Sequence, residues 1–422
     1  MGATESMSAA EARRRAVRAT LRIGVIMLSS GAQADEAGRD LREVMRALGL
    51  SDGEAIVTSS SVSVSYIAPG DAETTTAIRA VHDWRRDFAQ LDAVGALAKA
   101  IRDGKIGAPD AEIELDRIAN VAAPYPAWLR FAAPALLSAA VTILFRGTML
   151  DSIATFGIGL AIQPAQARIE RSALPLFFQI VFGVTATVSL AVLLAQLPLH
   201  LDAGLVLTGG LLRFLPGAQL VAGMRDLIAG AIVPGAANLA EVALHGVAIS
   251  SSAAFVLAIG HRLFGTEIGI SVAGAVAWPP VVTVAAGAAA TAAYCVRLGV
   301  PPRIVPTTVL LGATALVVAA GLPTRSANLD LDARTLVAAL GIGAAGRRLA
   351  EGLGRPAPLW LVPSILPLLP SPVALLPRLA ATQESPAILL AQALTIAFLI
   401  GVGVASGDIL MSAYQRRRAR RR

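Results

Sequence analysis

The sequence predicts an all-α polytopic membrane protein with about ten transmembrane helices in two five-helix repeats, preceded by a small α+β cytosolic domain. The composition leads to this prediction. Of the 422 residues, 55% are hydrophobic and only 15% are charged, whereas a soluble domain usually carries about 25% charged residues. Much of the charge also lies in the first part of the chain. A soluble protein of this length is therefore excluded, and the single cysteine, Cys295, excludes a secreted disulfide scaffold.

The first 123 residues are predicted to form the cytosolic domain. Leu21, Val25 and Leu28 fall on one helical face. The apolar stretch that contains them is about six residues long, shorter than the roughly 7–15 that a secretory signal needs, so no cleaved signal is expected. Val62 and Val64 alternate with serines, which is typical of a strand. The expected elements are helices over 8–29, 33–48, 91–102 and 109–120, and strands over 54–60, 62–66 and 74–81.

Ten apolar segments follow from Pro124 onward, several of them near the ~20 residues that a bilayer requires. The expected spans are 129–145, 149–166, 174–195, 203–223, 236–260, 270–296, 303–321, 332–349, 356–376 and 386–409. Pro279-Pro280 interrupts the sixth span, and the ninth contains too many prolines to form one straight helix. These spans divide into a first half over 124–262 and a second half over 263–412, before a basic tail over 413–422.

Arginines in the loops predict the orientation of the spans. If the N-terminus is inside, the inner loops hold twice as many arginines as the outer loops, so both termini are expected in the cytoplasm. The inner set is Arg168, Arg171, Arg225, Arg297, Arg303, Arg347, Arg348 and Arg355; the outer set is Arg146, Arg262, Arg325 and Arg378. The arginines of the tail are expected to contact anionic lipid of the cell (inner) membrane and not nucleic acid.

The two halves share a pattern of broken helices. Phe214-Leu215-Pro216-Gly217 is followed by a polar hinge and a long apolar helix, and Leu366-Pro367-Leu368-Leu369-Pro370-Ser371 is followed by a similar arrangement. Two repeats of five spans must be inverted with respect to each other, and such repeats with matching broken helices are typical of secondary transporters. Chance is the alternative, because proline is common in membrane helices.

Several stretches of the chain also carry a family pattern. They are the run from Gly38 to Leu50, Pro124-Tyr125-Pro126-Ala127-Trp128-Leu129, Pro216-Gly217 followed by Arg225-Asp226 and Gly230, Gly235 before Glu241, and the proline-rich segment from Pro363 to Pro370. On these stretches the chain resembles the threonine/serine exporter family over about residues 20–410. Ser371 departs from the pattern, since the family usually has a glycine there.

The resemblance implies an inner-membrane exporter of threonine, serine and similar small solutes, generally driven by the proton gradient. Some relatives of this kind move dicarboxylates, so an exporter of small dicarboxylates is an alternative. A passive small-solute channel is a second alternative and would be indifferent to a proton gradient. A membrane-embedded enzyme is not expected, because no nucleophile with its base and no metal constellation is evident.

Polar residues inside the predicted spans are the candidate site, because a charge buried in a bilayer is costly and usually functional. Asn238, Glu241 and His245 lie on one helical face, and Glu241 and His245 are four residues apart, close enough to share a proton. Instead of a functional site, this face could be a polar cluster that packs helices together. Arg225 and Asp226 are also candidates, and the alternative for them is an ion pair at the membrane interface that reaches water. The candidates for proton coupling are Glu241, Asp226, His245 and Asp151.

The candidates for substrate binding cluster around the helix breaks. Arg213 precedes the first break and would suit a carboxylate, and Asp408 is interpreted as a residue at the membrane edge. The full set of substrate candidates is Pro216, Gly217, Arg213, Asn238, Gln179, Pro367 and Pro370. No cofactor is expected. The expected partners are a small amino-acid substrate, protons and the lipid bilayer, with no nucleic acid; a homo-oligomer is left open.

Overall fold

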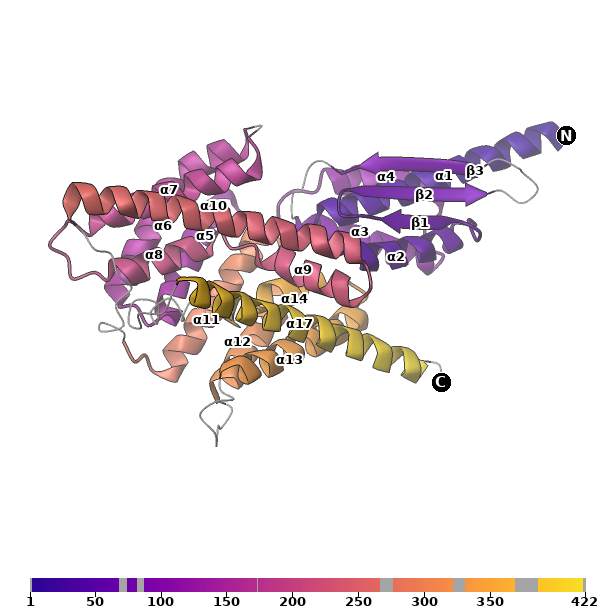
Figure 1. The fold of residues 1–422 in the computed structure, drawn as a ribbon. Helices are drawn as coiled ribbons and strands as arrows, with labels where there is room; N and C mark the ends of the chain where they lie inside the picture. Colours follow the sequence, from indigo (N-terminus) through magenta and orange to yellow (C-terminus); the bar gives the residue numbers. More distant parts are fainter. Residues whose placement is uncertain are drawn as a thin grey trace.

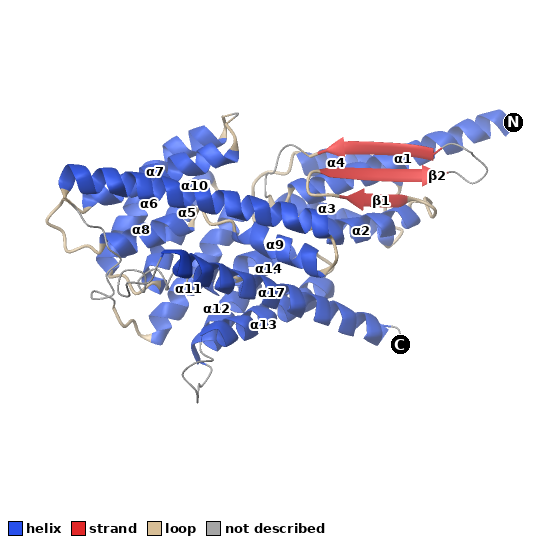
Figure 2. Ribbon diagram, viewed as in Figure 1, coloured by secondary structure: helices blue, strands red, loops and turns tan. Residues whose placement is uncertain are grey.

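The computed structural model describes residues 2–67, 74–81, 87–172, 174–265, 276–321, 331–368 and 386–419. A three-stranded sheet with four helices occupies one end of the molecule, and the remaining helices extend away from it (Figure 1). Both termini lie at the end that holds the sheet. The molecule is mostly helical, and its strands are confined to the N-terminal part (Figure 2).

The N-terminal part contains every element that the sequence predicts for it. The helices are α1 (Gly2–Ser29), α2 (Ala34–Ala47), α3 (Phe88–Arg102) and α4 (Ala108–Ala119), and the strands are β1 (Glu54–Val57), β2 (Ser61–Ile67) and β3 (Thr74–Ala80). The strands are antiparallel in the order β1-β2-β3. We call these elements together the N-terminal part.

The alternation along β2 decides which face of the sheet is covered. Val62, Val64 and Tyr66 are buried, as predicted, and Leu21 and Leu28 of α1 are buried in the same core. The apolar face of α1 therefore packs inside the protein. Helix α3 begins three residues before its predicted start because the Asp87 side chain accepts hydrogen bonds from the first backbone amides of the helix.

Each of the ten expected spans contains a described helix. The helices are α5 (Ala127–Leu144), α6 (Met149–Glu170), α7 (Leu176–Leu194), α8 (Ala203–Leu212) with α9 (Gly217–Ile228), α10 (Ile232–Phe264), α11 (Pro280–Leu298), α12 (Val305–Gly321), α13 (Leu331–Leu353), α14 (Pro358–Ser364) with the 3₁₀ turn η1 (Leu366–Leu368), and α17 (Pro386–Ala419). Helix α11 begins at Pro280, as the predicted interruption of the sixth span requires. Helix α17 continues past residue 413, so the described residues of the basic tail extend this helix.

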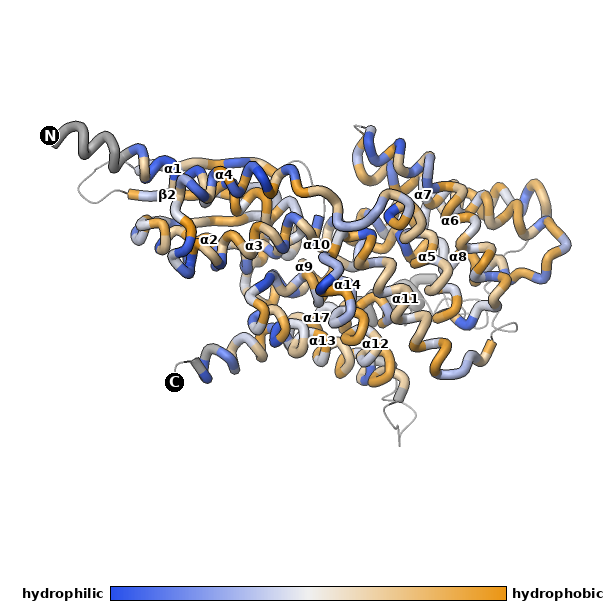
Figure 3. Tube along the Cα trace, turned by 180° about the vertical axis from the view of Figure 1, so that it is seen from behind, coloured by the Kyte–Doolittle hydropathy of each residue, from blue (hydrophilic) through white to orange (hydrophobic). Residues whose placement is uncertain are grey.

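Some of these helices are long enough and apolar enough to cross a membrane. Among the described residues, five helices have the length and apolar composition of a membrane span, and the bent pair α8–α9 makes a sixth if it is counted as one span. The five are α5, α7, α10, α11 and Phe398–Gln415 of α17, while α12 and the α14–η1 segment are apolar but shorter. Hydrophobic residues dominate this region, and hydrophilic residues gather on α1, α4 and the C-terminal end (Figure 3). The structure is that of a helical protein with several membrane-compatible helices.

Helices α13 and α17 approach each other closely through glycines. A Cβ atom at Gly343 would lie 2.1 Å from the carbonyl oxygen of Val404, and one at Gly407 would lie 2.1 Å from that of Leu340. Small residues that allow such contacts are typical of helix pairs in membranes. The contact brings Arg347, one turn after Gly343, to Asp408, the neighbour of Gly407.

Candidate functional site at the junction of the broken helix and the N-terminal part

The helix break predicted at Pro216-Gly217 is present. Helices α8 and α9 meet at 53°, and the backbone of Pro216 (φ −83°, ψ 55°) lies outside the helical region. Proline has no amide hydrogen and cannot continue a helical hydrogen-bond ladder. Gly217 begins α9 and is buried. The first turn of α9 therefore starts in the interior of the protein.

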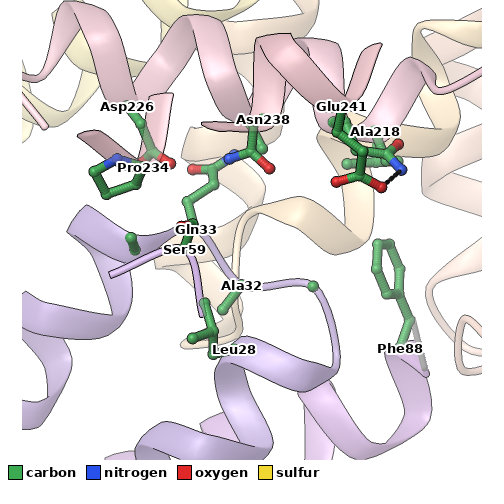
Figure 4. A pocket seen from close by; sticks show the side chains of 15 residues that line it. Leu28, Ala32, Gln33, Ser59, Phe88, Ala218, Asp226, Pro234, Asn238 and Glu241 are labelled. Atoms are coloured by element: carbon green, nitrogen blue, oxygen red, sulfur yellow. Dashed lines mark hydrogen bonds between the residues drawn. The ribbon is translucent and has the colours of Figure 1, made fainter. Parts of the chain in front are cut away.

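A pocket lies beside this first turn, between α9, the start of α10 and the connection from α1 to α2 (Figure 4). The pocket is small: about 40 Å³ of it is open to the centre of a water-sized sphere, which is room for a few water molecules or one small polar group. Its polar lining residues are Gln33, Ser59, Gln219, Asp226, Asn238 and Glu241. Three of these, Asp226, Asn238 and Glu241, are predicted site residues, and the structure brings them together.

Glu241 is the centre of a small polar cluster in this pocket. The Nε2 of Gln219 donates a hydrogen bond to the Oε1 of Glu241 at 3.0 Å. The same oxygen lies 3.9 Å from the Nε2 of His245, which is buried. The predicted proximity of Glu241 and His245 is therefore confirmed. The Glu241 side chain is 39% exposed, so this carboxylate can reach water through the pocket.

Two residues from the N-terminal part line the same pocket. Gln33 lies just before α2 and points toward Asn238 of α10 (Figure 4). Ser59 lies in the turn between β1 and β2. Neither residue was predictable, because nothing in the sequence indicates which turn of the N-terminal part faces the membrane helices. Gln219 was also missed, although its position half a turn after the break was a usable signal.

A closed ring of buried ion pairs lies near the pocket and joins four helices. The Glu36 carboxylate of α2 contacts Arg225 of α9 and Arg347 of α13, each at 3.1 Å. Asp408 of α17 contacts the same two arginines, with Arg225 Nε at 2.5 Å. All four residues are buried. We call this set the Glu36 ring.

The Glu36 ring decides one alternative left open by the sequence. Arg225 does not reach water, since it is 3% exposed and lies between two carboxylates. Asp408, interpreted as a residue at the membrane edge, is completely buried among these partners. The opposite charges of Arg225, Arg347 and Asp408 near the ends of three spans were a sequence signal for pairing. No sequence signal indicated that Glu36 of the N-terminal part would join them.

Further contacts attach the N-terminal part to the helical region. Asp92 of α3 is buried and pairs with Arg303 at 2.5 Å and Arg355 at 3.1 Å.

The charges of the ring determine the protonation state of Glu36. Burial alone would raise the pKa of Glu36, but the charges of Arg225 and Arg347 outweigh the effect of burial and lower this pKa to about 2. Glu36 is therefore ionised throughout the physiological range.

Arg213 is buried in the break between α8 and α9. Its Nη2 donates a hydrogen bond to the Oε1 of Gln163 at 2.7 Å, and its guanidinium lies 5.3 Å from the centre of the Phe214 ring. Its Nε and Nη1 atoms have no hydrogen-bond partner. Two free donors on a buried cation suit a carboxylate, as predicted, although Arg213 does not line the pocket described above.

The other predicted residues lie elsewhere. Gln179 donates to the carbonyl oxygen of Leu174 at the start of α7. Asp151 forms a capping box with Thr148 and accepts a hydrogen bond from the backbone amide of Asp202, and these bonds account for its burial. Pro367 packs near Gly287 and Gly312, whereas Pro370 lies outside the described residues. Within the described ranges, no group of three or more histidine, cysteine or acidic residues is arranged to hold a metal ion.

Comparison with known proteins places the chain in a family. A family model described as "Putative threonine/serine exporter" matches residues 18–260, which is more than half of the chain. A Mycobacterium tuberculosis protein named "Probable threonine/serine exporter" is 27% identical over 415 residues, covering 94% of this chain and 77% of that protein. No solved structure matches the chain.

Two further relatives match shorter parts. A Corynebacterium glutamicum "Threonine/serine exporter" is 28% identical over 228 residues, covering 53% of this chain and 47% of that protein. A Kluyveromyces lactis "Pheromone-regulated membrane protein 10" is 26% identical over 181 residues, covering 42% of this chain and 18% of that protein. Together with the apolar helices, the family match shows that this chain is a multi-pass membrane protein that belongs to the threonine/serine exporter family, a family of transporters and not of enzymes.

Proposed function

We propose that the protein exports threonine, serine or similar small amino acids from the cytoplasm and couples this export to the proton gradient. One observation carries the proposal beyond family membership. Glu241, a carboxylate that can gain and lose a proton, lines a pocket at the first turn of a broken helix and is held there by Gln219 and His245. A broken helix with an adjacent site is the arrangement that secondary transporters use.

Glu241 would couple protons to transport through its hydrogen bond with Gln219. The bond requires an acceptor oxygen on Glu241, and a deprotonated carboxylate supplies two. Protonation weakens this acceptor and removes a negative charge from the pocket, so it changes how firmly Glu241 holds α9. The nearby imidazole of His245 provides a second group through which a proton can pass. Arg213 would attract a substrate carboxylate at the other side of the break.

We further propose ten spans in two inverted halves, with both termini in the cytoplasm. The two longest described helices, α10 with 33 residues and α17 with 34, each follow an interrupted apolar segment. The N-terminal part pairs with Arg225, Arg303, Arg347 and Arg355, all predicted for the inner loops. Because basic loops favour the cytoplasm, these pairs support a cytoplasmic N-terminal part. The basic end of α17 would contact anionic lipid of the inner membrane.

Proteoliposomes test the proposed function. Uphill efflux of L-threonine or L-serine should require an imposed proton gradient, and Glu241→Gln should abolish it because an amide cannot titrate in this range. Exchange at equal concentrations on both sides can persist in this variant. Glu54→Gln, an exposed carboxylate of β1 outside the pocket, is the control and should export normally. Efflux that ignores the proton gradient would identify a passive channel, and transport of succinate in place of amino acids would identify a dicarboxylate exporter.

A further inference from the structure

Polar atoms without partners converge on the pocket. Both amide atoms of Gln33, the Oε1 of Gln219 and both carboxylate oxygens of Asp226 are buried and make no hydrogen bond in the described structure. These side chains belong to residues that are 2%, 4% and 1% exposed. Each unsatisfied buried polar group costs about 1–3 kcal/mol. The set is therefore unfavourable unless the pocket holds a polar occupant.

The identity of these atoms indicates what the occupant must offer. Four of the five are oxygens that accept hydrogen bonds, and one, the Nε2 of Gln33, is a donor. Exchanging the oxygen and nitrogen of Gln33 would not change this balance, and the Nε2 of Gln219 is already committed to Glu241. The pocket is therefore complementary to a group that is rich in donors.

Charge leads to the same conclusion. Two lining residues, Asp226 and Glu241, are carboxylic acids, and the lining includes no lysine, arginine or histidine among the described residues. The backbone amides of Ala34 and Asp35, at the start of α2, interact with the Asp226 carboxylate, but neither has the distance and angle of a full hydrogen bond. A further carboxylate would be repelled here, whereas a cation would be attracted.

We propose that this pocket binds the ammonium group of the transported amino acid, and that Gln33 of the N-terminal part is a specificity-determining residue for it. The proposal rests on the proposed function and names the chemistry of its site. An ammonium group offers three donors and one positive charge, which matches the free oxygens of Gln33, Gln219 and Asp226. The substrate hydroxyl can accept from the Nε2 of Gln33.

The Glu36 ring explains how a residue outside the membrane helices can hold a substrate. Glu36 lies one turn after Gln33 on α2, and its contacts with Arg225 and Arg347 fix the start of this helix against α9 and α13. Gln33 is thereby placed opposite Asn238 (Figure 4). The N-terminal part is then one wall of the binding site, and not an accessory attached to a complete transporter.

Equilibrium binding to the purified full-length protein tests the proposal. The ligands are L-threonine, its analogue with a hydroxyl in place of the ammonium group, and succinate. L-Threonine should bind, and the other two should bind at least tenfold more weakly. Gln33→Ala and the isosteric Asp226→Asn should each weaken L-threonine binding about tenfold or more, since a hydrogen bond to a charged group contributes about 1.5–3 kcal/mol. Gln90→Ala, on nearby α3 and outside the pocket, is the matched control and should bind normally.

The outcomes separate this inference from the proposed function. If Gln33→Ala and Asp226→Asn melt like the wild type and bind L-threonine with wild-type affinity, the inference is wrong, while loss of uphill export in Glu241→Gln would still support the exporter. Equal binding of L-threonine and its hydroxy analogue would also overturn the inference. If neither L-threonine nor L-serine, glycine or L-alanine binds or is exported, both proposals are wrong.

Discussion

Helices α2 and α9 each carry two polar residues close in sequence whose surroundings differ completely. At the start of α2, Glu36 contacts two arginines, whereas Gln33, the residue that precedes the helix, has no hydrogen-bond partner for its amide. On α9, Arg225 lies between two carboxylates, whereas neither oxygen of the adjacent Asp226 has a hydrogen-bond partner. All four residues are buried. Burial alone therefore does not distinguish residues that stabilise the fold from residues that bind a ligand.

The Glu36 ring and the pocket residues therefore have different roles. The charges of the Glu36 ring satisfy one another, so the ring can join the N-terminal part to three membrane helices without any ligand. The side-chain polar atoms of Gln33 and Asp226 in the pocket lack such partners and gain them only from an occupant. Changes in the ring should therefore affect stability first, and changes in the pocket should affect binding first.

The largest effect is expected from opening the ring. Glu36→Ala leaves two buried arginines with one carboxylate, and removing one partner of a buried ion pair costs about 3–5 kcal/mol. Asp116→Ala breaks the exposed pair with Arg22 and should cost at most about 1 kcal/mol. Thermal unfolding of the detergent-solubilised proteins measures both changes. Similar melting temperatures for the two variants would contradict the structural role of the ring.

A double variant tests whether the ring is stabilised by the balance of its charges. In the double variant Glu36→Gln with Arg347→Gln, the remaining Arg225 and Asp408 still pair. This variant should be more stable than either single variant, because no buried charge is left in excess. Additive losses in the double-mutant cycle would mean that Glu36 and Arg347 act independently.

The next effect concerns the helix break. Gly217→Val places a β-branched side chain in the buried first turn of α9, beside the pocket residues Ala218 and Gln219. We expect normal insertion into the membrane but at least about tenfold weaker binding of L-threonine. A radioligand binding assay on membrane vesicles measures this change. Unchanged affinity would mean that Pro216-Gly217 is only a structural kink.

The control for this variant follows from packing. Gly157→Ala is suitable because an added Cβ meets no atom within 4 Å. Gly209→Ala is unsuitable, although this glycine also precedes the break, because its Cβ would lie 2.0 Å from the Oγ1 of Thr142. The Gly157 variant should bind L-threonine normally.

A pH dependence distinguishes the ring from the pocket. The pKa of Glu36 is lowered to about 2 in the folded protein, below its usual value of about 4.3. The stability that this carboxylate contributes is therefore fully present above about pH 4.3 and is lost as the pH falls toward 2. The Asp40 carboxyl, whose pKa burial and the nearby Glu36 charge raise to about 6, titrates in a higher range. The melting temperature of Glu36→Gln should fall less steeply below pH 4 than that of the wild type, and parallel curves would contradict this assignment.

The smallest effect is expected at Asp151. Its capping box with Thr148 and its bond from the Asp202 amide resemble the ring in being already satisfied. Asp151→Ala should cost about 0.5–2 kcal/mol in stability, as is usual for a lost cap, and should preserve proton-driven export per folded molecule. Abolished export with normal folding would place Asp151 in the coupling path, as the sequence analysis allowed.

Periodicity predicted the local structure well. The alternation of Val62 and Val64 located β2, and Pro216-Gly217 and Pro279-Pro280 located a break and a helix start, because these signals depend on neighbouring residues. Glu241 with His245 was predictable for the same reason, since the helix repeat alone brings positions four apart together.

Contacts between distant parts of the chain were not predictable in the same way. Glu36 and Arg347 are 311 positions apart, and only the packing of α2 against α13 brings them together. Gln33 was missed because its importance depends on what it faces, and not on a motif around it. The pairing of Asp408 was not predictable either, because a single charge near a helix end can face lipid headgroups or an interior partner with equal ease.

Substrate protection of a single thiol tests most directly whether the N-terminal part forms a wall of the binding site. Ser59 lines the pocket and the next residue, Ser60, does not, so Ser59→Cys and Ser60→Cys in a Cys295→Ser background form a matched pair. The rate of maleimide labelling is measured with and without L-threonine. We predict that L-threonine slows labelling at position 59 in a saturable manner, that succinate does not, and that labelling at position 60 is unaffected. Equal rates at position 59 with and without saturating L-threonine, in a protein that still exports it, would contradict a binding site shared with the N-terminal part.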